Sequence, residues 1–199
     1  MKTAKIISII GHPIFHPTWM MIIMLLSGLT RFTPGNDMTF LTITISMTCL
    51  IPIIIIMMMK KWGIISSLEM DERNDRPGPL FIMVIFLYLT MRFFNKIPLF
   101  SIYNFYLTTV IVVTILAFAI TFFWKISLHA LGWGNFVACL FILTTISIRL
   151  YLLYFIASIV AAGIVATARL KLKSHSNAQI YAGFAMGFAT VLIMYFFFL

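Results

Sequence analysis

Two short polar segments carry the side chains best suited to chemistry in this chain. Residues 125–129 read KISLH, and residues 169–175 read RLKLKSH. Lysine, serine and main-chain N–H groups at the start of a helix can bind an anion, and arginine suits the oxygens of a phosphate. A histidine beside them can serve as a general acid or base near neutral pH. The residue types indicate a site for a phosphate-bearing partner.

A third charged segment lies earlier in the chain, at residues 72–76, which read ERNDR. Arg73 and Arg76 are three residues apart and would share one side of a helical turn. Each guanidinium can form paired hydrogen bonds to phosphate oxygens. The alternative interpretation is a solvated loop with local ion pairs.

The other segments also have simpler interpretations. Lys125 and His129 fit a snorkelling lysine and a histidine at the membrane interface. The bases of 169–173 fit a cytoplasmic anchor, which explains the lysines better than it explains His175. His12 and His16 flank two prolines, and we interpret them as residues at a helix entry rather than in a site.

The elements that must position these residues are apolar helices. Hydrophobic residues make up 62% of the 199 residues and charged residues only 10%, against about 25% charged in an ordinary globular domain. This composition excludes a soluble globular domain, a disordered chain and a secreted disulfide scaffold. Cys49 and Cys139 lie within apolar runs, where small apolar residues are expected rather than a disulfide or metal pair.

Apolar runs long enough to cross a bilayer predict about seven helices. Their ranges are 14–30, 39–59, 80–94, 103–124, 130–147, 149–168 and 178–199. We therefore predict an all-α, polytopic transmembrane bundle that forms a single integral membrane domain over residues 1–199. Gly183 and Gly187 form a Gly-x-x-x-Gly pair that favours close helix packing inside one chain over dimerisation. The oligomeric state is left open.

With seven spans, the N-terminus and the segments 60–79, 125–129 and 169–177 share one face of the membrane. Ten of the 14 lysines and arginines fall there, and the other four are Arg31, Arg92, Lys96 and Arg149. Because the bases stand between apolar runs, we expect the bilayer and a phosphorylated lipid as partners, and no nucleic acid. The excess of lysine and arginine on this face favours a cytoplasmic location. Some of these bases would be present to bind phosphate, however, so the side of the membrane that carries the three segments is left open.

In chain order, the three segments resemble the type 2 phosphatidic acid phosphatase superfamily. That family has the pattern Lys-x6-Arg-Pro, then Pro-Ser-Gly-His, then Ser-Arg-x5-His-x3-Asp. Arg76-Pro77 resembles the end of the first segment, Ser127 and His129 resemble the second, and Arg169 with His175 keeps the third spacing. Residues 171–183 and the His12-Pro13 start are similar to a small, divergent bacterial branch. The resemblance covers about 30 residues.

The resemblance implies a membrane lipid phosphatase of the bacterial inner membrane that needs no metal or other cofactor. His175 would attack phosphorus and form a phosphohistidine, and His129 would protonate the leaving oxygen. The phosphoryl oxygens would be held by a group of basic and hydroxyl residues: Arg73, Arg76, Lys125, Ser127 and Arg169. Substrates of this kind are phosphatidate, phosphatidylglycerophosphate and polyprenyl pyrophosphates.

The chain departs from the family pattern at several positions. Glu69 stands where the family has lysine, and Gln179 stands where an aspartate would orient the nucleophile. A glutamine carbonyl fixes the tautomer of an imidazole but brings no charge. Residues 126–129 also lack the proline and glycine of the second segment. These departures favour, as a second hypothesis, a relative that binds or moves a phosphorylated lipid; a small transporter or membrane-complex subunit is a third.

Overall fold

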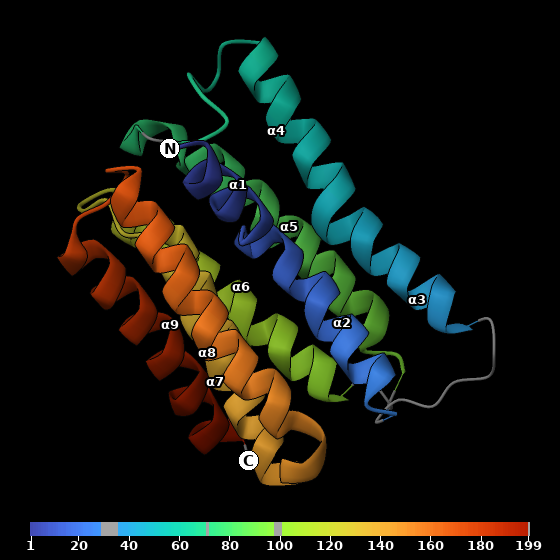
Figure 1. Ribbon diagram of the computed structural model, residues 1–199. Helices are drawn as coiled ribbons and strands as arrows, with labels where there is room; N and C mark the ends of the chain where they lie inside the picture. Colours follow the sequence, from blue (N-terminus) through green and yellow to red (C-terminus); the bar gives the residue numbers. More distant parts are fainter. Residues whose placement is uncertain (29–35, 71, 98–100, 199) are drawn as a thin grey trace. The chain divides into compact units, whose positions relative to one another are not determined.

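The computed structural model describes residues 1–28, 36–70, 72–97 and 101–198, which form helices joined by turns and loops and contain no β-strand (Figure 1). The elements in chain order are α1 (Lys2–Ile10), η1 (Pro13–Phe15), α2 (His16–Leu26), α3 (Asn36–Ile45), η2 (Ser46–Leu50), α4 (Ile51–Lys61), η3 (Arg73–Asp75), α5 (Pro77–Phe94), α6 (Ser101–Thr121), α7 (Leu128–Ile146), α8 (Ile148–Lys171) and α9 (Asn177–Phe198). The all-α prediction is confirmed.

Within the described ranges, seven helical segments are long and apolar enough to cross a membrane, as the sequence predicted. Their ranges are Lys2–Leu26, Asn36–Lys61, Arg73–Phe94, Ser101–Thr121, Leu128–Ile146, Ile148–Lys171 and Asn177–Phe197. The protein is therefore an integral membrane protein. Residues 29–30 of the predicted first span, residue 199 of the predicted seventh span and Arg31 lie outside the described residues.

The first span begins at Lys2, twelve residues before the predicted start at residue 14. His12 and Pro13 interrupt α-helical geometry without ending the span. The His12 side chain accepts a hydrogen bond from the main-chain N–H of Ile14 at 3.2 Å, and Pro13 stands in the first turn of η1. A histidine cap and a proline at this position suit a short 3₁₀ turn, which joins α1 to α2.

The second span contains a π-helical turn, η2, between α3 and α4. The main-chain N–H of Ile51 bonds to the carbonyl of Ser46, five residues earlier. Pro52 follows directly and has no N–H to offer to the preceding turn, so the regular α-helical ladder cannot continue through this point. The turn buries Thr48 and Cys49.

The chain divides into two compact units, residues 1–16 with 125–199 (unit 1) and residues 17–124 (unit 2). In unit 1, α7 lies against both α8 and α9, and α1 packs on α8 (Figure 1). In unit 2, α5 lies against α6, and the hydroxyl of Tyr103 donates to the carbonyl of Pro17 at 3.1 Å.

The two cysteines are buried, Cys49 in unit 2 and Cys139 in unit 1. The single-domain expectation stays a prediction.

Glycines allow the backbones of α7 and α9 to approach each other closely. A Cβ atom on Gly187 would lie 2.1 Å from the carbonyl oxygen of Leu131, and one on Gly134 would lie 2.2 Å from that of Phe184. A Cβ atom on Gly183 would lie 2.9 Å from the carbonyl oxygen of Ser127. The Gly183–Gly187 pair therefore packs within the chain, as expected. This approach holds the N-terminal ends of α7 and α9 next to each other.

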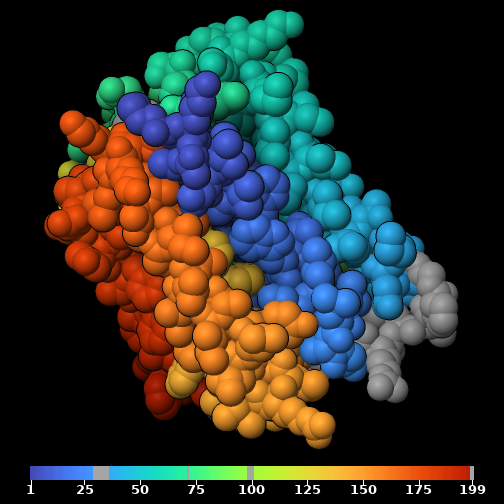
Figure 2. Space-filling model, in the orientation of Figure 1, coloured from blue at the N-terminus to red at the C-terminus, as the bar shows by residue number. Residues whose placement is uncertain are grey.

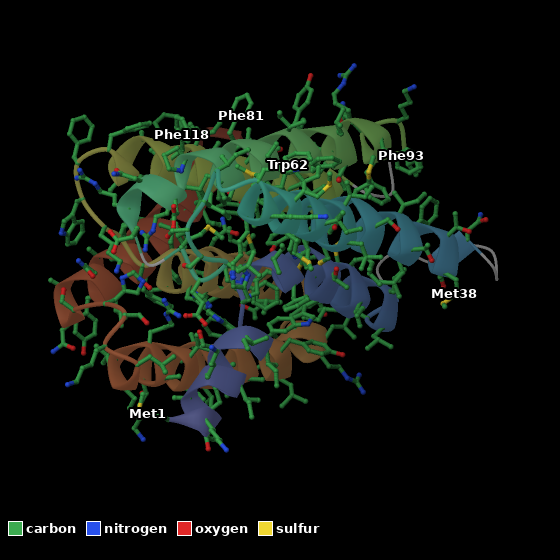
Figure 3. All side chains as sticks on the ribbon, turned by 90° about the horizontal axis from the view of Figure 1, so that it is seen from above. Met1, Met38, Trp62, Phe81, Phe93 and Phe118 are labelled. Carbon is green, nitrogen blue, oxygen red and sulfur yellow. The ribbon has the colours of Figure 1, made fainter. Side chains whose placement is uncertain are left out.

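The outer surfaces of the helices are apolar. On α8, drawn in orange in Figure 2, the exposed residues include Leu153, Ile156 and Val160. On α5, Phe81 and Phe93 project away from the helix (Figure 3). Helices of a membrane protein present such side chains to the hydrocarbon of the bilayer, because lipid is as apolar as they are.

Candidate functional site

Ser8 of α1 links two of the predicted site residues in unit 1. Its hydroxyl accepts a hydrogen bond from Nη1 of Arg169 at 3.0 Å. The Nε2 atom of His129 lies 3.0 Å from the main-chain oxygen of Ser8 and 3.4 Å from its Oγ. All three residues are buried, with at most 8% of their surface exposed. Arg169 lies in the last turn of α8 and His129 in the first turn of α7, so α1 connects the two helix ends.

His12 also contacts His129. Their ring centroids are 4.8 Å apart, and the rings are nearly perpendicular, at 84°. The Nδ1 atom of His12 accepts from Ile14, so a neutral His12 ring carries its proton on Nε2. His12 is therefore both the cap of η1 and a neighbour of the predicted general acid. His16 has a different setting, packed against Trp133 and Phe136 at centroid distances of 4.6 and 4.9 Å.

His175 and Gln179 meet at the start of α9. The Nδ1 atom of His175 is 3.1 Å from Oε1 of Gln179, and the main-chain N–H of Ser176 donates to the same oxygen at 3.1 Å. The hydroxyl of Ser176 in turn accepts from the main-chain N–H of Gln179 at 3.4 Å. This reciprocal pair is a capping box. Because Oε1 only accepts, Nδ1 of His175 carries a proton, and in the neutral ring Nε2 holds the lone pair.

The two groups of residues lie at the same end of unit 1. The main-chain N–H of Ser127 donates to the carbonyl of Gln179 at 3.4 Å, which ties the segment before α7 to α9. The turn between α8 and α9 is closed by a hydrogen bond from Ser174 N–H to the carbonyl of Arg169 at 3.3 Å. Ser8 in turn joins Arg169 to His129 through hydrogen bonds of its side chain and main chain. Arg169, His129 and His175 are thus brought together.

The charge of unit 1 is entirely basic. Residues 1–16 and 125–199 contain no aspartate or glutamate, but they hold all four histidines and seven of the 14 lysines and arginines. The five carboxylates of the chain are Asp37, Glu69, Asp71, Glu72 and Asp75, which all belong to unit 2. A buried guanidinium and clustered imidazoles in a unit without acidic side chains favour the binding of an anion.

Two predicted phosphate-binding residues stand just before α7. The Ser127 hydroxyl is fully buried and accepts from the main-chain N–H of Ala130 at 3.4 Å, so it caps the helix. Lys125 is half-buried, and among the described residues it makes no hydrogen bond or ion pair. The structure shows Ser127 to be a helix cap, and a phosphate contact of either residue stays a prediction.

The remaining predicted residues, Arg73 and Arg76, belong to unit 2. Arg76 is buried, and its Nε donates to the carbonyl of Met70 at 3.1 Å. Asp75 accepts from the main-chain N–H groups of Ser66 and Ser67 at 3.0 and 3.3 Å, and from the Ser66 hydroxyl. This segment is therefore an ordered loop held by Asp75, rather than only a solvated one. Arg73 and Glu69 are exposed.

No group of three or more histidine, cysteine, aspartate or glutamate side chains that could hold a metal ion is found in the described part of the chain. The residues present are donors for an anion: the arginine, the imidazoles and the hydroxyl of Ser8. Such groups can bind the oxygens of an anion.

The sequence interpretation missed Ser8 and Ser176. Ser176 had a detectable signal, because a serine followed three residues later by glutamine before an apolar run predicts a capping box. Ser8 had almost no signal in the sequence. It is one hydroxyl among the residues IISII of an apolar helix, and only the packing of α1 on α8 shows what it contacts.

The chain matches no family model, no curated protein and no solved structure. Membership of the type 2 phosphatidic acid phosphatase superfamily therefore stays a prediction that rests on the three segments.

Proposed function

We propose that the protein is an integral membrane phosphatase that hydrolyses a lipid phosphate or polyprenyl pyrophosphate, in the bacterial inner membrane, through a phosphohistidine. One observation carries the proposal: Arg169, His129 and the His175–Gln179 pair lie together at one end of a unit that has no aspartate or glutamate. The hydrogen bond to Gln179 leaves the lone pair of His175 on Nε2, as a nucleophile requires.

In the first step, Nε2 of His175 attacks phosphorus, and the bond between phosphorus and the lipid oxygen breaks. His129 enters this step doubly protonated and gives the proton on Nδ1 to the departing oxygen, while Nε2–H stays on the Ser8 carbonyl. A neutral lipid alcohol, or a lipid monophosphate from a pyrophosphate, leaves. Arg169 binds the non-bridging oxygens and stabilises their charge in the transition state. The product in the site is a phosphoramidate on His175.

In the second step, water attacks the phosphorus of phosphohistidine, and the bond between phosphorus and Nε2 breaks. The neutral His129 ring takes a proton from the water on Nδ1, which returns it to its starting state. Inorganic phosphate leaves, and His175 recovers its neutral form with the proton on Nδ1 directed at Gln179. No electron transfer or further reactant is needed.

The lipid nature of the substrate is supported by the position of the site. His175 lies in the turn between α8 and α9, outside the two spans, and both helices expose apolar side chains along their length. A phosphate group at this level can reach the basic residues while its acyl or prenyl tail stays in the hydrocarbon.

The test is phosphate release by purified protein in detergent from phosphatidate, phosphatidylglycerophosphate and undecaprenyl pyrophosphate. We expect release from at least one lipid, and its loss in His175→Ala and Arg169→Ala. Lys173→Ala is the matched control, because Lys173 is an exposed base in the same turn and should retain most activity. Release that persists in His175→Ala would contradict the proposed mechanism.

A second candidate is a protein that binds or moves a phosphorylated lipid without hydrolysis. Gln179 favours it, because its oxygen fixes the His175 tautomer but brings no negative charge to stabilise a cationic intermediate. Lipid-phosphate binding that survives His175→Ala, without phosphate release by the native protein, would support this candidate. A gain of phosphate release in Gln179→Glu would then identify the missing charge as the cause.

A third candidate is a transporter or complex subunit. Lipid-phosphate binding and phosphate release that are unchanged in both His175→Ala and Arg169→Ala would favour it.

A further inference from the structure

We infer that Ser8 is a positioning residue that couples Arg169 to His129, so that the amino-terminal helix α1 is part of the phosphate site. The inference rests on the proposed function. The segments 72–76, 125–129 and 169–175 contain no residue of α1, and the position of Ser8 in the sequence indicates no role for it. The assignment comes from the contacts of α1 with α7 and α8.

The direction of the hydrogen bonds defines what Ser8 does. An arginine only donates, so Oγ of Ser8 must accept from Nη1 of Arg169 at 3.0 Å. A main-chain carbonyl only accepts, so Nε2 of His129, 3.0 Å from the Ser8 oxygen, carries a proton in this arrangement. One residue therefore orients a guanidinium with its side chain and an imidazole with its main chain.

The position of Ser8 is fixed by the packing around it. At Gly11, which follows the last residue of α1, a Cβ atom would lie 2.3 Å from a side-chain carbon of Val165. The carbonyl of Gly11 accepts from Nε1 of Trp133 at 3.0 Å. These contacts dock the end of α1 on α8 and α7. A small residue at position 11 is required for α1 to approach close enough for Ser8 to reach Arg169.

The energetic role of Ser8 follows from the burial of the three partners. A guanidinium has five N–H donors, and Ser8 takes one of them, which restricts the orientation of the group in the absence of substrate. A hydrogen bond to a charged group contributes about 1.5–3 kcal/mol, which corresponds to about ten-fold to a hundred-fold in an equilibrium constant. Ser8→Ala removes this bond and the 3.4 Å contact of Oγ with Nε2 of His129, but keeps the shorter main-chain contact to His129.

The test is a double-mutant cycle on Ser8→Ala and Arg169→Ala, with orthovanadate as the phosphate-like probe. We expect Ser8→Ala to weaken inhibition by vanadate and to raise KM by about ten-fold or more, with a smaller change in kcat. In the Arg169→Ala background, Ser8→Ala should have no further effect on vanadate binding. Ser8→Thr, which keeps the hydroxyl, should restore most of the loss.

The matched control is Ser158→Ala. Ser158 is a buried serine of α8 whose hydroxyl donates to the carbonyl of Phe155 at 2.7 Å within its own helix. The Ser158→Ala variant should leave vanadate inhibition and KM unchanged. If the native protein hydrolyses phosphate esters but Ser8→Ala and Arg169→Ala weaken vanadate binding additively, the role of Ser8 is overturned and the proposed function is not. A native protein that neither hydrolyses phosphate esters nor binds vanadate would overturn the proposed function and, with it, this role.

Discussion

The oxygen of Gln179 contacts Nδ1 of His175 and the main-chain N–H of Ser176, both at 3.1 Å. One side chain therefore caps α9 and selects the tautomer of the proposed nucleophile. The two roles are separable, because the reverse half of the capping box runs through the hydroxyl of Ser176 and does not involve the imidazole.

Gln179→Ala should affect both roles. Loss of the Oε1 acceptor removes a helix cap that contributes about 1 kcal/mol, so the midpoint of thermal unfolding should fall. Loss of the contact to His175 should lower the rate of phosphate release by about ten-fold. Both quantities are measurable on the same detergent-solubilised sample.

Ser176→Ala is the control for Gln179→Ala. It removes the acceptor of the Gln179 main-chain N–H but leaves Oε1 in contact with His175. We expect a similar loss of stability with a nearly unchanged rate. An equal drop in rate for the two variants would show that the capping of α9, and not the His175 contact, controls activity.

The close packing of α7 on α9 makes a second prediction. In Gly187→Ala the new methyl group would lie 2.1 Å from the carbonyl oxygen of Leu131, so the two backbones must separate. We expect a loss of about 1–3 kcal/mol, seen as a lower midpoint of thermal unfolding.

Gly163→Ala is the matched control for this packing. Gly163 is exposed within α8, and a Cβ atom there would have no neighbour within 4 Å. Alanine is favoured over glycine in a helix by about 1 kcal/mol, so the variant should be at least as stable as the native protein. A neutral Gly187→Ala would show that α7 and α9 are not in direct backbone contact.

Trp133→Phe tests the attachment of the amino-terminal segment. The aromatic packing on His16 would remain, but the hydrogen bond from Nε1 to the carbonyl of Gly11 would be lost. A buried acceptor left without its partner costs about 1–3 kcal/mol, so both thermal stability and the protection of residues 1–16 from proteolysis should decrease. Trp62→Phe is a suitable control, because Trp62 is 65% exposed.

Asp75→Asn tests the loop that leads into α5. The carboxylate accepts from Ser66 and Ser67, and an amide would replace one of its two acceptor oxygens with a donor. We expect a loss of about 1.5–3 kcal/mol, as for hydrogen bonds to charged groups, and faster proteolysis between residues 62 and 70. Glu72→Gln, at an exposed neighbouring position, should change neither measurement.

The spans were predictable because the apolar length of each segment is a property of the sequence alone. The start of the first span was wrong for a physical reason. His12 and Pro13 read as the end of regular structure, whereas the side chain of His12 caps a 3₁₀ turn that continues the span. The π-helical turn before Pro52 was also missed, because a proline in an apolar run does not show whether the helix ends or accommodates it.

The part of the candidate site that lies around the turn between α8 and α9 was predictable, because its residues follow one another at a recognisable spacing in the sequence. Arg169, His175 and Gln179 are separated by five and three residues across a single turn, so their proximity follows from local geometry. Ser8 is separated from Arg169 by 161 positions in the chain, and no local pattern reports a contact of that kind. Its discovery required the packing of α1 on α8.

The most direct measurement is the detection of the phosphorylated intermediate. The native protein, mixed with labelled lipid phosphate and quenched in alkali, should carry phosphate on His175 that is released by mild acid, as expected for a phosphoramidate. His175→Ala should carry none, whereas Ser158→Ala should be labelled as the native protein is. Hydrolysis of the lipid by native protein with no label at His175 would contradict the account.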